Sequence, residues 1–244
     1  MRLTVLGSAG TYPVAGRPSS GYLIEHENTV VWCDAGPGTY MALTRDLADI
    51  DAIFISHRHP DHCLDVVIAS HAFAFRPEPR FGVPLYGPES ALKAVTGFTD
   101  GGRIEEVYDC RPLDEGDEVE IGDLRLAVAI SDHSVPTLAS RWESDHRSLC
   151  YSADTGPDGE WMRLAEKADL FLCEASYQGD PGAAPYPHHL TAGEAGQIAR
   201  DAGARHLMLT HIPPHLDPAR SVAEAEAKFD RPVSLAVPGA STTL

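Results

Sequence analysis

The sequence has no apolar run close to the ~20 residues that a membrane-spanning helix requires, so we expect no membrane partner. A secretion signal is also lacking, because the apolar stretch in MRLTVLGSAG stops at Gly7 and no cleavage site follows. This stretch is typical of a first β-strand instead. We therefore expect a cytoplasmic protein.

Basic residues are scarce as well. The 244 residues include 19 Lys and Arg against 36 Asp and Glu, which gives a formal net charge of −17. Proteins hold phosphate backbones mainly with Lys and Arg, so this balance weighs against a nucleic-acid partner. The five cysteines are widely spaced and include no CxxC pair, and we expect them to be reduced, buried thiols.

What the sequence does contain is an alternation of short apolar runs with amphipathic stretches. No repeat, low-complexity linker or shift in composition divides it, so one domain over residues 1–244 is expected. The predicted strands are residues 3–6, 22–25, 30–33, 53–56, 119–121, 124–130, 149–153, 170–173, 206–210 and 233–237. Two sheets with helices on their outer faces would satisfy this order of elements.

Three helices are predicted between the strands. The first follows His62 and ends before Pro77, the second begins with a capping box at Thr191, and a third opens at Asp217-Pro218. The residues at helical spacing in the first helix are Leu64, Val67, Ile68, His71, Ala72 and Phe75. Residues 76–116 are rich in Pro and Gly, and we expect them to form loops over one end of the sandwich.

The clearest chemical signal is the hexapeptide His57-Arg58-His59-Pro60-Asp61-His62, which lies between a predicted strand and the first predicted helix. Three imidazoles and one carboxylate within six residues can converge on one point. The alternative is a solvated histidine-rich loop. However, crowded imidazoles repel each other once protonated and gain little from proximity without a metal. The spacing therefore predicts a metal site.

This turn resembles the signature of the metallo-β-lactamase superfamily. In that family the first two histidines bind one metal, and the Asp and the last histidine bind a second. The resemblance implies three further ligands on loops after strands, and the sequence has a candidate at each place, with Asp154 where the family's bridging carboxylate would lie. The seven implied ligands are His57, His59, Asp61, His62, His133, Asp154 and His211.

The resemblance extends from about Leu3 to His211 and implies an α/β fold, the four-layered αββα sandwich. The sequence DAGPG, which begins at Asp34, matches the family's D-x-G-x-G turn, whose Asp usually supports a metal ligand. All the implied ligands offer N or O donors, which suits two Zn²⁺ ions and would also accept Mn²⁺ or Fe²⁺. An oxygen-reducing branch has Glu in place of His59, and the antibiotic-degrading branch has a secretion signal and usually a Cys ligand. We therefore expect a hydrolase of another branch.

The sequence His189-Leu190-Thr191 resembles the H-x-T element of the tRNase Z-like phosphodiesterase branch. In that branch the His, paired with an upstream carboxylate, stabilises or protonates the leaving alkoxide, and Glu174 is the matching carboxylate here. The alternative is that His189 is a surface residue at a helix start. Only 20 residues separate His133 from Asp154, too few for the basic arm of the tRNA-processing enzymes, so a tRNA substrate is not expected.

These features predict a hydrolase of small phosphodiesters, similar to a compact bacterial group that includes cyclic-nucleotide phosphodiesterases. A 3′,5′-cyclic nucleotide is the lead substrate. Asp61 would bind metal and orient the attacking hydroxide, while His189 and Glu174 would assist departure of the ribose oxygen. Five aromatic residues near the motifs could stack on a base, although each alone is more typical of a core: Phe73, Phe75, Trp142, Tyr177 and Tyr186.

Three alternatives to this function stay open at the level of sequence. A lactone or thioester hydrolase would use the same metal centre, and a tRNA 3′-processing endonuclease would share its chemistry. A metal-binding module without turnover is the third alternative, although the complete ligand set argues against it. A homodimer would cover the open end of such a small acidic domain.

Overall fold

Near-continuous apolar runs along the strands produce sheets that are buried on both faces. In β1 (Arg2–Gly7), Leu3 and Val5 pack toward the facing sheet, whereas Leu6 packs toward a helix layer. The computed structural model describes residues 1–98, 104–181 and 185–244, and within them the strands form two seven-stranded sheets.

Both sheets mix parallel and antiparallel neighbours. The first has the order β14-β1-β2-β3-β4-β5-β6 and, besides β1, contains β2 (Gly21–His26), β3 (Thr29–Ala35), β4 (Ala52–Phe54), β5 (Val83–Gly87), β6 (Tyr108–Pro112) and β14 (Ser241–Thr243). The second has the order β13-β12-β11-β10-β9-β8-β7 and contains β7 (Glu118–Ile121), β8 (Leu124–Ile130), β9 (Leu138–Ser144), β10 (Arg147–Tyr151), β11 (Leu170–Glu174), β12 (Leu207–Thr210) and β13 (Val233–Leu235).

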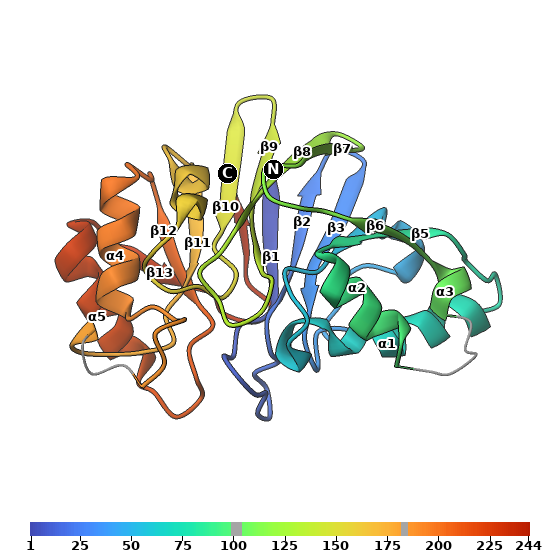
Figure 1. Ribbon diagram of the computed structural model, residues 1–244, viewed down its shortest axis with the longest axis horizontal. Helices are drawn as coiled ribbons and strands as arrows, with labels where there is room; N and C mark the ends of the chain where they lie inside the picture. The colour runs from blue at the N-terminus through green and yellow to red at the C-terminus, as the bar shows by residue number, and fades with distance from the viewer. Residues whose placement is uncertain (99–103, 182–184) are drawn as a thin grey trace.

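Helices cover the outer face of each sheet. The helical elements are η1 (Leu47–Asp49), α1 (Pro60–Phe75), α2 (Glu89–Thr96), α3 (Ile104–Val107), η2 (Glu160–Ala165), α4 (Ala192–Asp201) and α5 (Pro218–Phe229). Figure 1 shows α4 and α5 at the left, the two sheets in the centre and α1, α2 and α3 at the right. The predicted αββα sandwich is therefore confirmed. None of the helices in the described ranges has both the length and the apolar content needed to span a membrane.

The interface between the two sheets holds aromatic pairs. Phe54 of the first sheet meets Trp142 of the second at 5.7 Å between ring centroids, with the rings edge to face. Tyr22 meets Tyr151 in the same way at 5.2 Å. Such pairs contribute about 0.5–1.5 kcal/mol each beyond their burial. This central layer fixes the two sheets, and hence the loops at their ends, relative to each other.

Residues 76–116 are not loops over one end of the sandwich, so that prediction was wrong. Apart from residues 99–103, which lie outside the described residues, the segment contains β5, α2, α3 and β6 and extends the first sheet. Val83 and Leu85 of β5 are buried in the helix-side core. Packing against neighbouring elements stabilises these short strands, and the local sequence does not reveal that packing.

Three smaller predictions also change. The strands β9 and β14 were not predicted, because polar residues such as Arg141 and Glu143 interrupt the apolar pattern of β9. In α1, the side chains of Ile68 and Phe75 are exposed, and the opposite face packs on the first sheet. Since both faces of α1 are apolar, spacing alone does not identify the buried one.

Four cysteines are buried free thiols as predicted, but Cys110 on the edge strand β6 is exposed.

The turn after β3 packs against the start of α1 without room for a side chain at Gly36. A Cβ atom at this position would lie 1.9 Å from the carbonyl oxygen of Asp61. We expect Gly36→Ala to lower the free energy of unfolding by about 1–3 kcal/mol or more, because the helix start must shift. Urea unfolding measures the change.

The matched control is Gly193→Ala in α4, where a Cβ would meet no atom closer than 3.9 Å. A helical Gly→Ala change with free space is expected to be neutral or to stabilise by up to about 1 kcal/mol. Equal stability of the two variants would contradict the close approach at Gly36.

Candidate metal centre

The histidine-rich turn connects β4 to α1. The backbone of His59, the N-cap of α1, is extended with φ −65° and ψ 141°, and the helix begins at Pro60. His57 therefore precedes the helix, whereas Asp61 and His62 lie in its first turn. This change of backbone direction lets four side chains from six residues reach one place.

A first group of four side chains offers ligand atoms that all lie within 4.8 Å of one another: His57, His59, His133 and Asp154. The Nε2 atoms of His57 and His133 each lie 3.1 Å from Nδ1 of His59. Tetrahedral Zn–N bonds of about 2.0–2.1 Å place ligand nitrogens ~3.3 Å apart, which is close to this spacing. The group therefore fits one small divalent ion.

A second group lies beside the first and shares a residue with it: Asp61, His62, Asp154 and His211. His211 Nε2 lies 3.2 Å from Asp61 Oδ2 and 3.4 Å from Asp154 Oδ1. In the first group, the Asp154 atom closest to His57 is Oδ2, at 3.7 Å from Nε2. Asp154 thus presents one carboxylate oxygen to each group, as a bridging ligand would.

Two buried atoms of the second group have no hydrogen-bond partner among the described residues, namely His62 Nε2 and Asp154 Oδ1. Such atoms are rare, because leaving a buried polar group unsatisfied costs about 1–3 kcal/mol. These two lie 3.2 Å apart, so one cation could bind both. The donor set and these two atoms fit a divalent metal centre.

Most of the ligand candidates already have the protonation state that a metal requires. Burial lowers the pKa of His57, His59 and His133, which leaves their imidazoles neutral. Burial alone would raise the pKa of Asp154, but the charge of His211 is the largest of several influences that together hold this pKa well below its usual range. Metals bind neutral imidazoles and ionised carboxylates.

The pKa of His62 shifts in the opposite direction to those of His57, His59 and His133. Burial lowers its pKa, but the carboxylates of Asp154, Asp61 and Asp34 outweigh burial and raise this pKa well above its usual value. A divalent ion bound by the same carboxylates would compete with that proton.

Asp34 orients two of the histidines. Its buried carboxylate accepts a hydrogen bond from His62 Nδ1 at 2.8 Å, which directs Nε2 of that ring toward the second group. It also accepts from the Ser56 hydroxyl at 2.8 Å, and Ser56 Oγ in turn lies 3.0 Å from His57 Nδ1. The expected support of a metal ligand by Asp34 therefore has a direct geometric basis.

Glu174 connects His189 to the centre through a residue that was not predicted from the sequence, Ser176. The buried Glu174 carboxylate lies 2.9 Å from His189 Nδ1 and accepts the Ser176 hydroxyl at 2.7 Å. Since that hydroxyl donates to Glu174, it accepts from His211 Nδ1, 3.0 Å away. One carboxylate thus fixes both a ligand candidate and the predicted proton donor. The only sequence signal was a hydroxyl residue two positions after Glu174.

His189 lies next to the second group. Its ring stacks on that of His211, with 5.7 Å between centroids and 10° between planes. Burial lowers its pKa, but the charge of Glu174 and the hydrogen bond to it prevail and raise the pKa of His189 to about 9. The neighbouring His188 contributes its backbone, because its carbonyl accepts a hydrogen bond from His133 Nδ1 at 3.1 Å.

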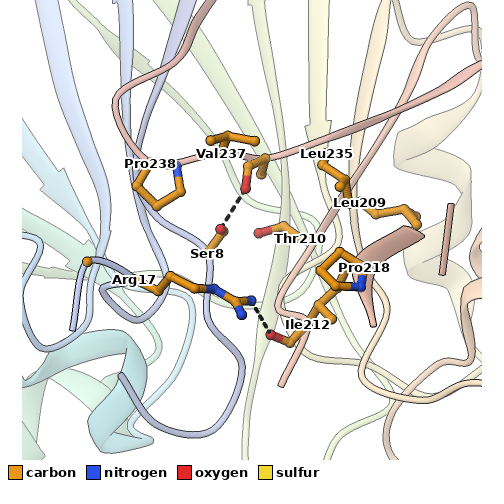
Figure 2. A pocket seen from close by; sticks show the side chains of 11 residues that line it. Ser8, Arg17, Leu209, Thr210, Ile212, Pro218, Leu235, Val237 and Pro238 are labelled. Carbon is orange, nitrogen blue, oxygen red and sulfur yellow. Dashed lines mark hydrogen bonds between the residues drawn. The ribbon is translucent and has the colours of Figure 1, made fainter. Parts of the chain in front are cut away.

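Three residues at the strand ends that carry the centre have a left-handed backbone. Asp34, Ala153 and His211 have φ values of 55°, 52° and 52°, in the left-handed region that disfavours such residues. Figure 2 shows a contact that fixes the residue after His211: the Arg17 guanidinium donates a hydrogen bond to the Ile212 carbonyl oxygen at 3.4 Å. Strain of this kind persists only where surrounding contacts fix the backbone.

The structure brings together every residue that the sequence nominated for the site. Seven ligand candidates form the two groups, and the Glu174–His189 pair adjoins the second. They come from the ends of β4, β8, β10, β11 and β12, from the first turn of α1 and from the loop before α4.

The part of the sequence that contains all of these residues matches a known family. Residues 29–212 match a family model described as the β-lactamase superfamily domain. The chain belongs to the metallo-β-lactamase superfamily. The uncharacterized protein ML1173 of Mycobacterium leprae is 35% identical over 249 residues, which cover 98% of this chain and 87% of that relative.

Two further relatives carry names or titles that describe chemistry or fold. A ribonuclease Z of Methanopyrus kandleri is 30% identical over 264 residues, covering 92% of this chain and 91% of the relative. The crystal structure of the metallo-β-lactamase fold protein YhfI from Bacillus subtilis has a TM-score of 0.88 at 25% identity, covering 99% of this chain and 98% of that chain. The protein is therefore a metallo-hydrolase of this fold.

We expect the purified protein to hold about two divalent ions per chain. Asp154→Asn should lose more metal than His59→Ala, because Asp154 belongs to both groups and His59 to one. Elemental analysis after dialysis measures the content, and His146→Ala, an exposed histidine on the β9–β10 turn, is the control. A folded Asp154→Asn protein that keeps both ions would contradict the shared carboxylate.

Proposed function

We propose that this metallo-hydrolase cleaves a small phosphodiester, with a 3′,5′-cyclic nucleotide as the lead substrate. The observation that carries this proposal is the hydrogen bond of 2.9 Å between His189 and the buried Glu174, next to the second ligand group. A ribose oxygen is a poor leaving group at phosphorus, so a positioned proton donor accelerates its departure.

We propose Zn²⁺ for both ions, held by His57, His59, His133 and Asp154 in the first group and by Asp61, His62, Asp154 and His211 in the second. Mn²⁺ and Fe²⁺ would also accept these N and O donors. When bound, two divalent ions would lower the pKa of water and stabilise negative charge on the phosphoryl oxygens. The Asp61 side chain is 13% exposed, which leaves it accessible to orient the attacking water.

His189 would act as the general acid. Its Nδ1 hydrogen is engaged by Glu174, so the proton available to a substrate is the one on Nε2. The negative charge of Glu174 keeps the ring protonated at neutral pH in the free protein. As the bond from phosphorus to the ribose oxygen breaks, that proton would move to the oxygen. The ring would then be neutral and still hydrogen-bonded to Glu174.

A small substrate is favoured over a nucleic acid. The chain between His133 and Asp154 is taken up by the β9–β10 hairpin, which leaves no segment for a basic arm. The net charge of −17 also disfavours a polyanion. The ribonuclease Z relative from Methanopyrus kandleri supports phosphodiester chemistry, because the RNA backbone is a phosphodiester.

A lactone or thioester hydrolase is the competing function, and a substrate panel separates the two. We expect the metal-loaded protein to open cyclic AMP and to cleave bis(p-nitrophenyl) phosphate, with little turnover of an acyl lactone. Product formation followed by chromatography measures all three. Fast lactone turnover without phosphodiester cleavage would overturn the proposed function.

The role of His189 predicts a specific defect. We expect His189→Ala to keep its metal while kcat for cyclic AMP falls by about 10²–10⁴-fold, as is typical for loss of a general acid. Steady-state kinetics and metal analysis on the same preparation measure both effects, with His146→Ala as the control. Unchanged turnover in His189→Ala would remove this residue from the reaction.

A further inference from the structure

A cavity of about 310 Å³ lies on the His189 side of the metal centre. Its lining includes Thr11, Ser176, Tyr177, His189, His215 and Arg220. Two of these residues also belong to the centre: Ser176 contacts Glu174 and His211, and His189 stacks on His211. The cavity and the metal centre therefore share a wall.

The charged groups in the cavity wall already have partners. Arg220 Nε donates to Glu224 Oε1 at 2.7 Å, and His189 Nδ1 lies 2.9 Å from Glu174 Oε1. Because these cations are compensated, the cavity offers little attraction for a second phosphate group. It suits an uncharged body that has polar edges.

Hydrogen bonds hold two of the lining residues in place before any ligand binds. Gln178 Nε2 donates to the Asp217 carbonyl at 2.6 Å and to Ser221 Oγ at 2.8 Å, so its amide hydrogens are engaged and its carboxamide oxygen remains an acceptor for a ligand. The backbone of Tyr177 is bonded on both sides, to Leu190 and Ala192. Less conformational entropy is lost when a ligand binds to a cavity whose side chains are already fixed.

We infer that this cavity binds the nucleoside body of the substrate, with the rings of Tyr177 and His215 against the base. The inference rests on the proposed function. In that function His189 protonates the leaving oxygen, so the group that carries this oxygen extends toward the His189 side. The cavity lies there, and Tyr177 packs edge-on to His189 at 6.1 Å between ring centroids.

The size of the cavity agrees with this occupant. Small-molecule sites typically measure about 300–1,000 Å³, and this cavity of about 310 Å³ stands at the lower limit. It has room for one nucleoside and not for a folded RNA. Aromatic side chains suit a planar base, because stacking contributes without requiring a charge.

Adenosine tests the inference, since it has a base and a ribose but no phosphate. We expect the metal-loaded protein to bind it at millimolar concentrations in a calorimetric titration. Tyr177→Ala and His215→Ala should each weaken adenosine binding by about tenfold or more, as loss of base stacking does. Tyr177→Phe, which keeps the ring, should retain most of the affinity, and His146→Ala should bind as the wild type does.

Kinetics supply a second measurement. For cyclic AMP we expect Tyr177→Ala and His215→Ala to raise KM by about tenfold and to change kcat by less than about threefold, because neither residue contacts the reacting atoms. Metal content and melting temperature equal to those of the wild type would exclude a folding defect.

The outcomes separate this inference from the proposed function. If bis(p-nitrophenyl) phosphate is cleaved and cyclic AMP is not, the proposed substrate is wrong. The adenosine titrations alone then test whether the cavity binds a nucleoside. No adenosine binding by the wild type would overturn the inference. Wild-type affinity in both Tyr177→Ala and His215→Ala would overturn it as well, whatever the substrate.

Discussion

The carboxylate of Asp34 joins the parts of the molecule from which the metal centre is built. It lies near the end of β3 and accepts hydrogen bonds from the backbone and hydroxyl of Ser56, from the ring of His62 and from the hydroxyl of Tyr151. Tyr151 belongs to the second sheet and the other donors to the first half of the chain. A fully buried carboxylate is tolerated only with such partners, so the sheet contact and the positions of the histidines depend on each other.

The part of the site that could be predicted from the sequence is the part formed locally. His57, His59, Asp61 and His62 lie within six residues, so their convergence follows from one turn. His133, Asp154 and His211 were nominated by resemblance alone, because their approach depends on the order of strands in the second sheet. Ser176 could not be predicted, since its contact with His211 spans 35 residues of sequence.

In the fold, too, the elements that could be predicted are those whose pattern is local. Long alternating runs such as β8 predicted their strands, because one buried face imposes a period of two. The short parallel strands β5 and β6 have no comparable pattern, and they depend on neighbours that are far away in sequence. In α1 the sequence predicted a helix correctly but not its buried face, since both faces are apolar and only the sheet beneath it selects one.

The proposed ligands are divided between the two sheets. The turn at residues 57–62 follows β4 of the first sheet, whereas His133, Asp154 and His211 follow strands of the second. Each ion would therefore tie one half of the sandwich to the other, and the unfolded chain would have no complete site for either. Binding only to the folded form stabilises that form by mass action. The supply of metal would then set how much of this protein is folded as well as how fast it works.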